Sequence, residues 1–268
     1  MWFFKCPEFF FGEDALSQLE MLHGQRAFIV TDANIAKLGF PDLVQKTLAN
    51  ANIDSQVFAE VEPDPSLQTV QRGAEAMLAY EPDWIIGLGG GSSMDAAKAM
   101  WILYERPGIE PESISPMEDL GLRAKARLIC IPTTAGTGSE VGRSSVITLK
   151  ATGRKAVIFH PELLARLVIL DPVLTVGLPP KLTAATGADA LTHCIESYTC
   201  PAFHPMCDGI ALEGIRLIVE ALPRACRDGG DLDARGRMLV AAAMGAVAFQ
   251  KDLGAVHSLA HPLSTLCG

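Results

Sequence analysis

DWIIGLGGGSSMDAAKAMWILY, residues 83–104, is the stretch that decides the fold class. Its short apolar run, glycine-rich turn and helical pattern follow one another directly, so it predicts a buried strand that leads into a helix. Similar text surrounds it: RAFIVTD (26–32), SQVFAEV (55–61) and ARLICIPTT (126–134) are typical of strands, and SLQTVQRGAEAMLAY (66–80) is typical of a helix. Strands that alternate with helices predict a parallel sheet with both faces covered.

The pattern changes after LVILDPVLTVGLPP, residues 167–180. Beyond this segment the sequence is rich in alanine and helical in its spacing, and no part of it favours a strand. Pro179 and Pro180 stand at the change, where proline can open a helix at its first turn. We therefore expect a Rossmann-like α/β domain in residues 1–178 and an all-helical domain in residues 179–268.

Composition narrows the class of protein. The 268 residues carry a net charge of −9 and contain no clustered run of Lys and Arg, which argues against a nucleic-acid groove. The seven cysteines are scattered without a CxxC pair, as expected for free thiols in a reducing compartment. Charges and proline interrupt the apolar N-terminus, and no apolar run reaches about 18 residues, so we expect neither a signal peptide nor a membrane span. These features favour a soluble, cytoplasmic protein.

The glycine-rich turn is the first candidate ligand site. Gly89, Gly90 and Gly91 follow a predicted strand directly, and glycine lets the backbone approach a ligand closely. The helix that begins near Ser92 would direct free N–H groups at the same point, an arrangement that binds phosphate. The spacing matches neither the GxGxxG of dinucleotide-binding folds nor a P-loop, so the segment alone is also compatible with a simple tight turn.

A second loop supports the phosphate interpretation. IPTTAGTGSE, residues 131–140, also follows a predicted strand and offers the hydroxyl groups of Thr133 and Thr134. A parallel sheet brings the loops at the carboxyl ends of its strands together, so two such loops favour a dinucleotide. Asp32 ends the predicted strand 26–32, where a carboxylate can bind a ribose 2′-hydroxyl and repel a 2′-phosphate. The same residue could instead cap the helix that follows.

Two pairs of residues in the helical region favour a metal site. Asp189 and His193 are four residues apart, as are His257 and His261, and on a helix each pair shares a face. Carboxylate and imidazole ligands suit Zn(II), Fe(II) or a similar divalent ion. Either pair alone could be a surface ion pair or part of a capping network, but the presence of both after a nucleotide-like domain favours the metal.

Four segments together resemble the iron-containing (group III) alcohol dehydrogenase family: GGGSSMDAAKA, IPTTAGTGSE, TAATGADALTHCIE and GAVHSLAHPL. The resemblance follows the family's order and runs from the first strand to the last residue. It implies that the cofactor, NAD or else NADP, contacts Asp32, Gly89, Gly90, Gly91, Ser92, Asp95, Thr133, Thr134 and Lys155. Within this set the glycines would wrap the pyrophosphate, Lys155 would approach the nicotinamide ribose, and Asp32 would favour NAD over NADP. Lys98 completes the same motif as Asp95.

The resemblance also implies the metal ligands. Asp189, His193 and His257 would hold a divalent ion, Fe(II) or Zn(II), and His261 would lie near the active centre, where it could relay the alcohol proton. The family's fourth ligand is a histidine beyond the position of Gly268, and further helices follow it, so the helical domain is incomplete relative to the family. A catalytic site can work with three protein ligands and an open position.

The expected function is that of an NAD-dependent oxidoreductase that interconverts a small primary or secondary alcohol and its aldehyde or ketone, with the metal as Lewis acid. Two alternatives stay open: a glycerol dehydrogenase-like polyol dehydrogenase, and a shortened, non-catalytic protein that binds nucleotide or metal. The apolar N-terminal segment is typical of an edge strand. The backbone N–H and C=O groups on the open side of an edge strand can pair with a strand of another chain. We therefore expect a homodimer that pairs through residues 2–11.

Overall fold

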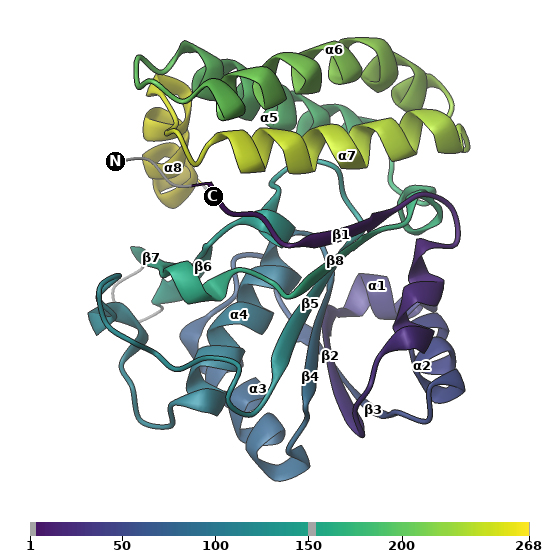
Figure 1. The fold of residues 1–268 in the computed structure, drawn as a ribbon, viewed down its shortest axis with the longest axis vertical. Helices are drawn as coiled ribbons and strands as arrows, with labels where there is room; N and C mark the ends of the chain where they lie inside the picture. The colour runs from purple at the N-terminus through teal and green to yellow at the C-terminus, as the bar shows by residue number, and fades with distance from the viewer. Residues whose placement is uncertain (1–3, 150–153, 268) are drawn as a thin grey trace.

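A computed structural model describes residues 4–149 and 154–267, without the side chains of Glu112, His261, Pro262 and residues 264–267. Its main feature is a six-stranded sheet with the order β1-β8-β5-β4-β2-β3. All neighbouring strands in it are parallel, as predicted (Figure 1). The strands are β1 (Glu8–Phe11), β2 (Arg26–Asp32), β3 (Asp54–Val61), β4 (Trp84–Gly89), β5 (Arg127–Pro132) and β8 (Leu167–Leu170). The helices between them are α1 (Ala33–Lys37), α2 (Phe40–Asn50), α3 (Leu67–Tyr80) and α4 (Gly91–Glu105).

Helices cover both faces of this sheet. Consecutive strand residues point to opposite faces, so Ile85 and Ile86 of β4 enter different cores, and both are fully buried. One core lies against α3 and α4, and Trp101 of α4 is completely buried in it. The other lies against α2 and the 3-10 helix Ala15–Met21. Because both faces are covered, the central strands are apolar along their length.

A two-stranded antiparallel hairpin interrupts the strand–helix alternation between β5 and β8. It consists of β6 (Ser144–Leu149) and β7 (Arg154–Phe159), which were not among the strands expected from the sequence. Two of its residues attach it to the domain, because Thr148 bridges Ser66 and the Ser145 hydroxyl donates to the Asp95 carbonyl at 2.7 Å. The hairpin therefore extends the α/β domain beside α4.

The second part of the chain is helical, as expected. Small residues bring its helices close together, since a Cβ on Gly214 would lie 2.7 Å from the sulfur of Cys194 on the preceding helix. The first of these helices begins at Pro180, with proline in its first turn as predicted. None of the helices in the described ranges is both long and apolar enough to cross a bilayer. These helices are α5 (Pro180–Thr199), α6 (Pro205–Arg227), α7 (Leu232–Ala248) and α8 (Ala255–Cys267).

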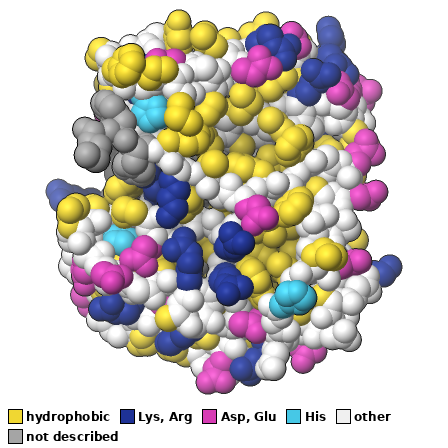
Figure 2. All heavy atoms as spheres, viewed as in Figure 1, with side chains coloured by type: hydrophobic (Ala, Val, Ile, Leu, Met, Phe, Trp, Pro, Cys, Tyr) yellow, Lys and Arg dark blue, Asp and Glu magenta, His cyan; other side chains and the backbone are white. Residues whose placement is uncertain are grey.

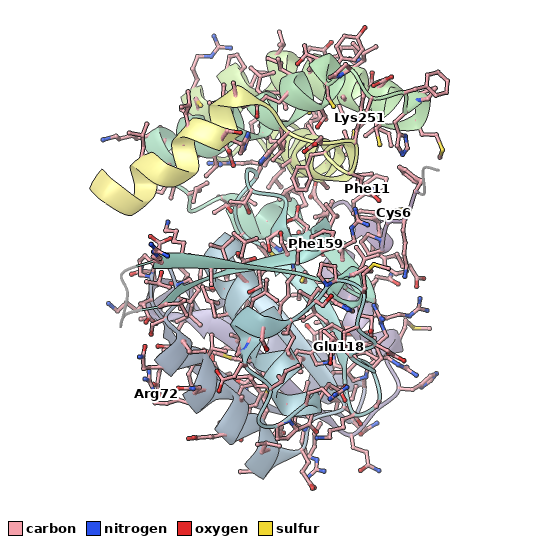
Figure 3. All side chains as sticks on the ribbon, turned by 90° about the vertical axis from the view of Figure 1, so that its left-hand side faces the viewer. Cys6, Phe11, Arg72, Glu118, Phe159 and Lys251 are labelled. Carbon is pink, nitrogen blue, oxygen red and sulfur yellow. The ribbon has the colours of Figure 1, made fainter. Side chains whose placement is uncertain are left out.

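β1 is the outer strand of the sheet, as the N-terminal segment predicted. Among the described strands it pairs with β8 alone, so its other edge carries no strand. Phe11 is 68% exposed there, and Figure 2 shows hydrophobic side chains gathered on the face that carries β1 and α7. Cys6 and Phe11 both line an apolar hollow of about 250 Å³ on this side of the molecule (Figure 3). Residues 2 and 3 of the expected pairing segment lie outside the described residues.

Candidate nucleotide cleft and metal centre

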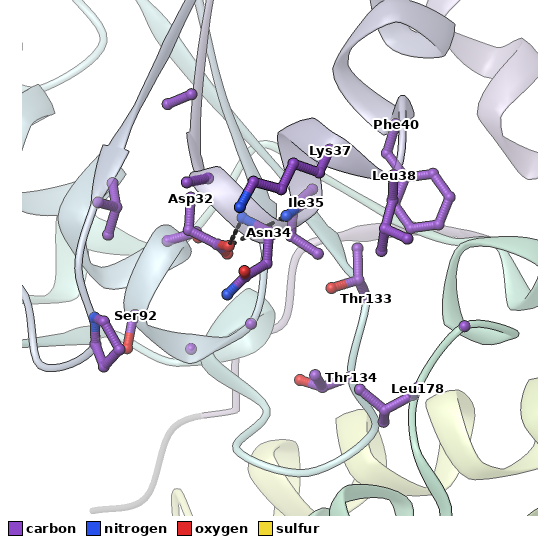
Figure 4. A pocket seen from close by; sticks show the side chains of 18 of the residues that line it. Asp32, Asn34, Ile35, Lys37, Leu38, Phe40, Ser92, Thr133, Thr134 and Leu178 are labelled. Atoms are coloured by element: carbon purple, nitrogen blue, oxygen red, sulfur yellow. Dashed lines mark hydrogen bonds between the residues drawn. The ribbon is translucent and has the colours of Figure 1, made fainter.

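A cleft of about 850 Å³ opens at the carboxyl ends of β2, β4 and β5. The two predicted ligand loops meet there, because one follows β4 and the other follows β5. The segment 177–179 and Leu182 of α5 contribute to the remaining wall. Most residues that the resemblance assigns to the cofactor line this cleft (Figure 4): Asp32, Gly90, Gly91, Ser92, Thr133 and Thr134.

The three glycines of the turn are not equivalent. Gly89 has a φ of +139°, and a Cβ there would lie 2.7 Å from the Ser93 hydroxyl oxygen, so this position requires glycine. A Cβ on Gly91 would lie 3.0 Å from the Thr137 hydroxyl oxygen, so the two loops pack closely. Gly90 has a φ of −80°, and a Cβ there would meet its nearest neighbour at 3.7 Å, at the cleft. Because Gly90 is the N-cap of α4 and has no side chain, the first N–H groups of α4 are available to an anion.

Asp32 both caps a helix and faces the cleft. Its Oδ1 accepts hydrogen bonds from the backbone N–H groups of Asn34 at 2.8 Å and Ile35 at 3.1 Å (Figure 4). The capping alternative is therefore confirmed. The other carboxylate oxygen accepts from the Ser93 hydroxyl at 3.4 Å, and the residue still lines the cleft. A cap does not exclude a ribose contact, because a carboxylate has several acceptor positions.

Asp95 and Lys98 hold the loop after the threonines. Asp95 accepts hydrogen bonds from the Ser139 hydroxyl at 2.5 Å and from the Val146 N–H at 2.9 Å. The fully buried Lys98 ammonium donates to the carbonyls of Ser139 at 2.6 Å and Gly142 at 3.0 Å. Burial raises the pKa of Asp95, and the Lys98 ammonium opposes that rise. Asp95 is not among the residues that line the cleft, so its visible contacts support the fold of the cofactor loop.

Lys155 extends from the hairpin toward the segment after β3. It lies on β7, and its ammonium is 2.9 Å from the Asp64 carboxylate. Lys155 does not line the cleft either, although the neighbouring residues Glu62 and Pro63 do. The structure thus brings Lys155 to the rim of the region expected to hold the cofactor.

Three predicted metal ligands come together from two helices. Asp189 and His193 lie on α5, and His257 arrives from α8. One ligand atom of each residue lies within 4.8 Å of those of the other two. The Asp189 Oδ1 atom is 3.9 Å from His193 Nε2 and 3.5 Å from His257 Nε2. The two imidazole rings are stacked, with centroids 4.5 Å apart and planes inclined by 18°.

The electrostatics of this group suit a divalent cation. Burial lowers the pKa of His193, and the Asp189 carboxylate opposes that shift. The hydrogen bond with Asp189 raises the pKa of His257, with a further contribution from Glu196. Two stacked imidazoles repel each other when both are charged, whereas a shared cation would use the lone pairs of both rings and the carboxylate together. The donor set therefore fits Zn(II) or Fe(II).

One face of α5 connects the cleft with this group. Leu182 lines the cleft, Thr186 packs against Gly136 of the threonine loop, and Asp189 and His193 follow at helical spacing. The seven residues from Leu182 to Asp189 correspond to about 10 Å along a helix. Asp189 of the candidate metal centre thus lies about 10 Å further along α5 than Leu182 in the cleft wall.

Sequence reasoning missed Glu196, which also lies on this face. Its carboxylate is 2.5 Å from Nδ1 of His257. The available signal was its spacing, because Asp189, His193 and Glu196 follow one another at four and three residues within one helix. His261, predicted as the proton relay, lies on α8, but its side chain is outside the part that the structure describes.

Comparisons with known proteins identify the family. Residues 6–172 match the model of the iron-containing alcohol dehydrogenase, and residues 183–268 match that of the Fe-containing alcohol dehydrogenase family, C-terminal. The chain is 41% identical over 262 residues to the NADPH-dependent butanol dehydrogenase of Clostridium saccharobutylicum, covering 96% of this chain and 67% of the relative. It is also 41% identical over 273 residues to aldehyde-alcohol dehydrogenase 2 of Entamoeba histolytica, covering 97% of this chain but only 31% of that protein.

The fold agrees with these matches. The crystal structure of a 1,3-propanediol oxidoreductase superposes with a TM-score of 0.93 at 36% identity, covering 99% of this chain and 71% of the other. The chain therefore belongs to the iron-containing alcohol dehydrogenase family. Members of this family are oxidoreductases of alcohols and aldehydes that use NAD(P) and a metal.

Proposed function

We propose that this chain carries the nucleotide site and three metal ligands of an NAD-linked alcohol dehydrogenase that interconverts a small alcohol and its aldehyde or ketone. The observation that carries this proposal is that two of the three candidate metal ligands, Asp189 and His193, lie on α5, the helix whose first turn forms part of the cleft. A dinucleotide whose pyrophosphate lies at the start of α4 would extend toward that group. Its reactive ring and the alcohol would then meet between the two parts of the chain.

The candidate site residues have separate roles in binding the cofactor, binding the metal and relaying the alcohol proton. The N–H groups at Gly90 and Gly91 bind the pyrophosphate, because a helix N-terminus favours an anion. Asp189, His193 and His257 would hold Zn(II) or Fe(II), which supplies Lewis-acid chemistry to the alcohol oxygen when bound. Thr133 and Thr134 offer hydroxyl groups to the cofactor from the second loop. We keep His261 as the candidate relay for the alcohol proton, from its sequence position near the site.

Asp32 supports a preference for NAD. Its carboxylate lies at the end of β2 and lines the cleft, and an added 2′-phosphate there would face a negative charge. The relative from Clostridium saccharobutylicum is named as NADPH-dependent, so cofactor preference varies within this degree of similarity. The substrate likewise varies, since relatives at 41 to 42% identity are named for butanol and for 4-hydroxybutyrate.

A homodimer is also part of the proposal. Within the described part of the chain no strand pairs with the outer edge of β1, so its backbone groups can accept a partner strand, and an apolar hollow lies beside it. Pairing of two such edges would satisfy those groups and cover Phe11. Sedimentation at tens of micromolar tests this, because a monomer at that concentration would contradict it.

The activity is tested by initial rates of NAD reduction with a panel of primary alcohols, secondary alcohols and polyols, after loading with Zn(II) or Fe(II). The control is the Asp189→Asn variant, which keeps the shape of the side chain and removes the charged ligand. We expect a metal-dependent rate that this variant loses. A rate confined to polyols would favour the glycerol dehydrogenase-like alternative. Binding of NAD and metal without turnover of any alcohol would favour the non-catalytic one.

A further inference from the structure

We propose that Glu196 is a positioning residue that holds His257 in the one tautomer and orientation in which its Nε2 can bind the metal. This inference rests on the proposed metal site and adds a residue to it. Glu196 lies on α5 with Asp189 and His193, and its side chain is 8% exposed. It therefore contacts the third ligand from the helix that supplies the first two.

The contact between the two side chains determines the tautomer. Glu196 Oε2 is 2.5 Å from His257 Nδ1, while His257 Nε2 is directed at Asp189 Oδ1, 3.5 Å away. A carboxylate only accepts hydrogen bonds, so Nδ1 must carry the proton that it donates. In the neutral ring Nε2 then carries the lone pair and is the atom that a cation would bind. Carboxylates that accept from the second nitrogen of a metal-bound histidine fix ring orientation in this way.

The same carboxylate also fixes the start of α8. Its Oε1 accepts a hydrogen bond from the Val256 N–H at 2.6 Å. Gly254 precedes the helix, and its carbonyl accepts the N–H of Ser258, but it has no side chain to cap the remaining donors. A Cβ on Gly254 would lie 2.9 Å from Glu196 Oε1, so the backbone rests directly on the carboxylate. Glu196 thus performs the capping that the sequence before α8 does not provide.

A separate contact anchors the segment between α7 and α8. The side chain of Lys251 is 3% exposed. Its ammonium lies 2.6 Å from the Asp208 carboxylate and 3.3 Å from the Tyr198 carbonyl. This pair restrains the segment through other side chains than Glu196 and His257. It therefore offers a control that loosens the same segment through different atoms.

An isosteric change separates positioning from simple support. In Glu196→Gln the side-chain amide has one accepting oxygen and one donating nitrogen. If the oxygen caps Val256, the nitrogen faces Nδ1 of His257 and favours the tautomer whose proton is on Nε2. If the amide turns, the cap is lost. Neither arrangement keeps both the cap on Val256 and the tautomer with its proton on Nδ1, although the shape of the side chain is unchanged.

The test is calorimetric titration of the metal-free full chain with Zn2+ alone, together with imidazole ¹⁵N spectra of the Zn2+-loaded protein. Glu196→Gln is compared with Asp208→Asn, which loosens the Lys251 anchor, and with Glu213→Gln, the same chemical change at an exposed ion pair on α6. We expect Zn2+ affinity to fall about 10- to 100-fold in Glu196→Gln, the range for outer-shell partners of metal ligands. Both controls should keep the wild-type affinity.

The ¹⁵N spectra keep the proposal testable even if Glu196→Gln fails to fold. In the wild-type chain, His257 should show a protonated Nδ1 and a metal-bound Nε2. Equal Zn2+ affinity in Glu196→Gln and wild type, an equal loss in Asp208→Asn, or Zn2+ on Nδ1 would each overturn the role of Glu196 while leaving the metal site intact. A wild-type chain that binds no Zn2+ would overturn the proposed metal site, and this inference with it.

Discussion

Gly136 lies so close to Thr186 that a Cβ on the glycine would be 2.7 Å from the threonine Cβ and 2.9 Å from its carbonyl oxygen. Gly136 belongs to the loop that follows Thr134 in the cleft wall. Thr186 lies on α5 between Leu182, which lines the cleft, and Asp189 of the metal group. The loop in the cleft wall and α5 are therefore packed directly against each other, without room for a side chain.

Gly136→Ala should consequently lower the free energy of unfolding by about 1 to 3 kcal/mol, the usual cost of overpacking. The clash is with the Cβ and the backbone atoms of Thr186, which cannot rotate away. Urea unfolding measures the effect. Gly177→Ala is the matched control, because its Cβ would meet its nearest neighbour at 4.0 Å. Equal stability of the two variants would show that the loop and α5 are not in firm contact.

Gly90→Val should abolish NAD binding while the protein stays folded. The φ of Gly90 is −80°, so a side chain at this position would not strain the backbone. The new side chain would occupy the space at the start of α4 where the pyrophosphate is expected. Calorimetry with NAD provides the measurement. Gly209→Val, at an exposed position of α6, is the control, since a Cβ there meets nothing within 4 Å. Unchanged NAD affinity in a folded Gly90→Val protein would refute the cleft assignment.

Asp32→Asn should raise the affinity for NADP relative to NAD. Asparagine is as good an N-cap as aspartate, so the helix start is retained while the negative charge is removed. The ratio of the two dissociation constants reports the charge effect, and the melting temperature checks that the cap is kept. If the ratio stays at the wild-type value, Asp32 is only a cap and cofactor preference is determined elsewhere.

Because of Glu140, the free energy of unfolding should depend on pH. Burial raises the pKa of its carboxyl from 4.5 to about 7, even though hydrogen bonding to its own backbone and the nearby Lys98 ammonium lower it. Between these two values the unfolded chain loses its proton first and the native state binds more protons, so the free energy of unfolding falls as the pH rises. Glu140→Gln removes this effect. Its stability relative to wild type should increase by up to about 3 kcal/mol between pH 5 and pH 8.

Urea titrations of wild type and Glu140→Gln at several pH values in this range measure the difference. Glu213→Gln serves as the control for loss of a charge at an exposed position. A constant difference between wild type and Glu140→Gln across the range would mean that Glu140 is ionised in the native state throughout.

The sheet and the first helix of the second part were predictable because their signals are local. The run 26–32 matches β2 residue for residue, since β-branched and aromatic residues fill a strand that is buried on both faces. α5 begins at Pro180 because proline is tolerated in a first helical turn. The β6–β7 hairpin was missed because its contacts with Asp95 and Ser66 depend on residues distant in the sequence.

For the site too, contacts within one helix were predictable from the sequence, whereas contacts between distant elements were not. Helical spacing indicated that Asp189 and His193 share a face, but only the family resemblance joined His257 to them, because the turn after α7 decides where α8 lies. The motif residue Asp95 was expected at the cofactor, whereas its hydrogen bonds reach Ser139, in the loop after the threonines, and Val146 of β6. Tertiary contacts of this kind leave no periodic trace in the sequence.

The central claim is that Asp189, His193 and His257 form one divalent-metal site, and Zn2+ titration of the metal-free chain tests it most directly. We expect one Zn2+ per chain, with His257→Ala binding at least about 100-fold more weakly, because losing a ligand costs more than losing an outer-shell partner. His23→Ala, the same change at an exposed histidine, should bind as wild type does. Equal Zn2+ stoichiometry and affinity in His257→Ala and wild type would contradict the account.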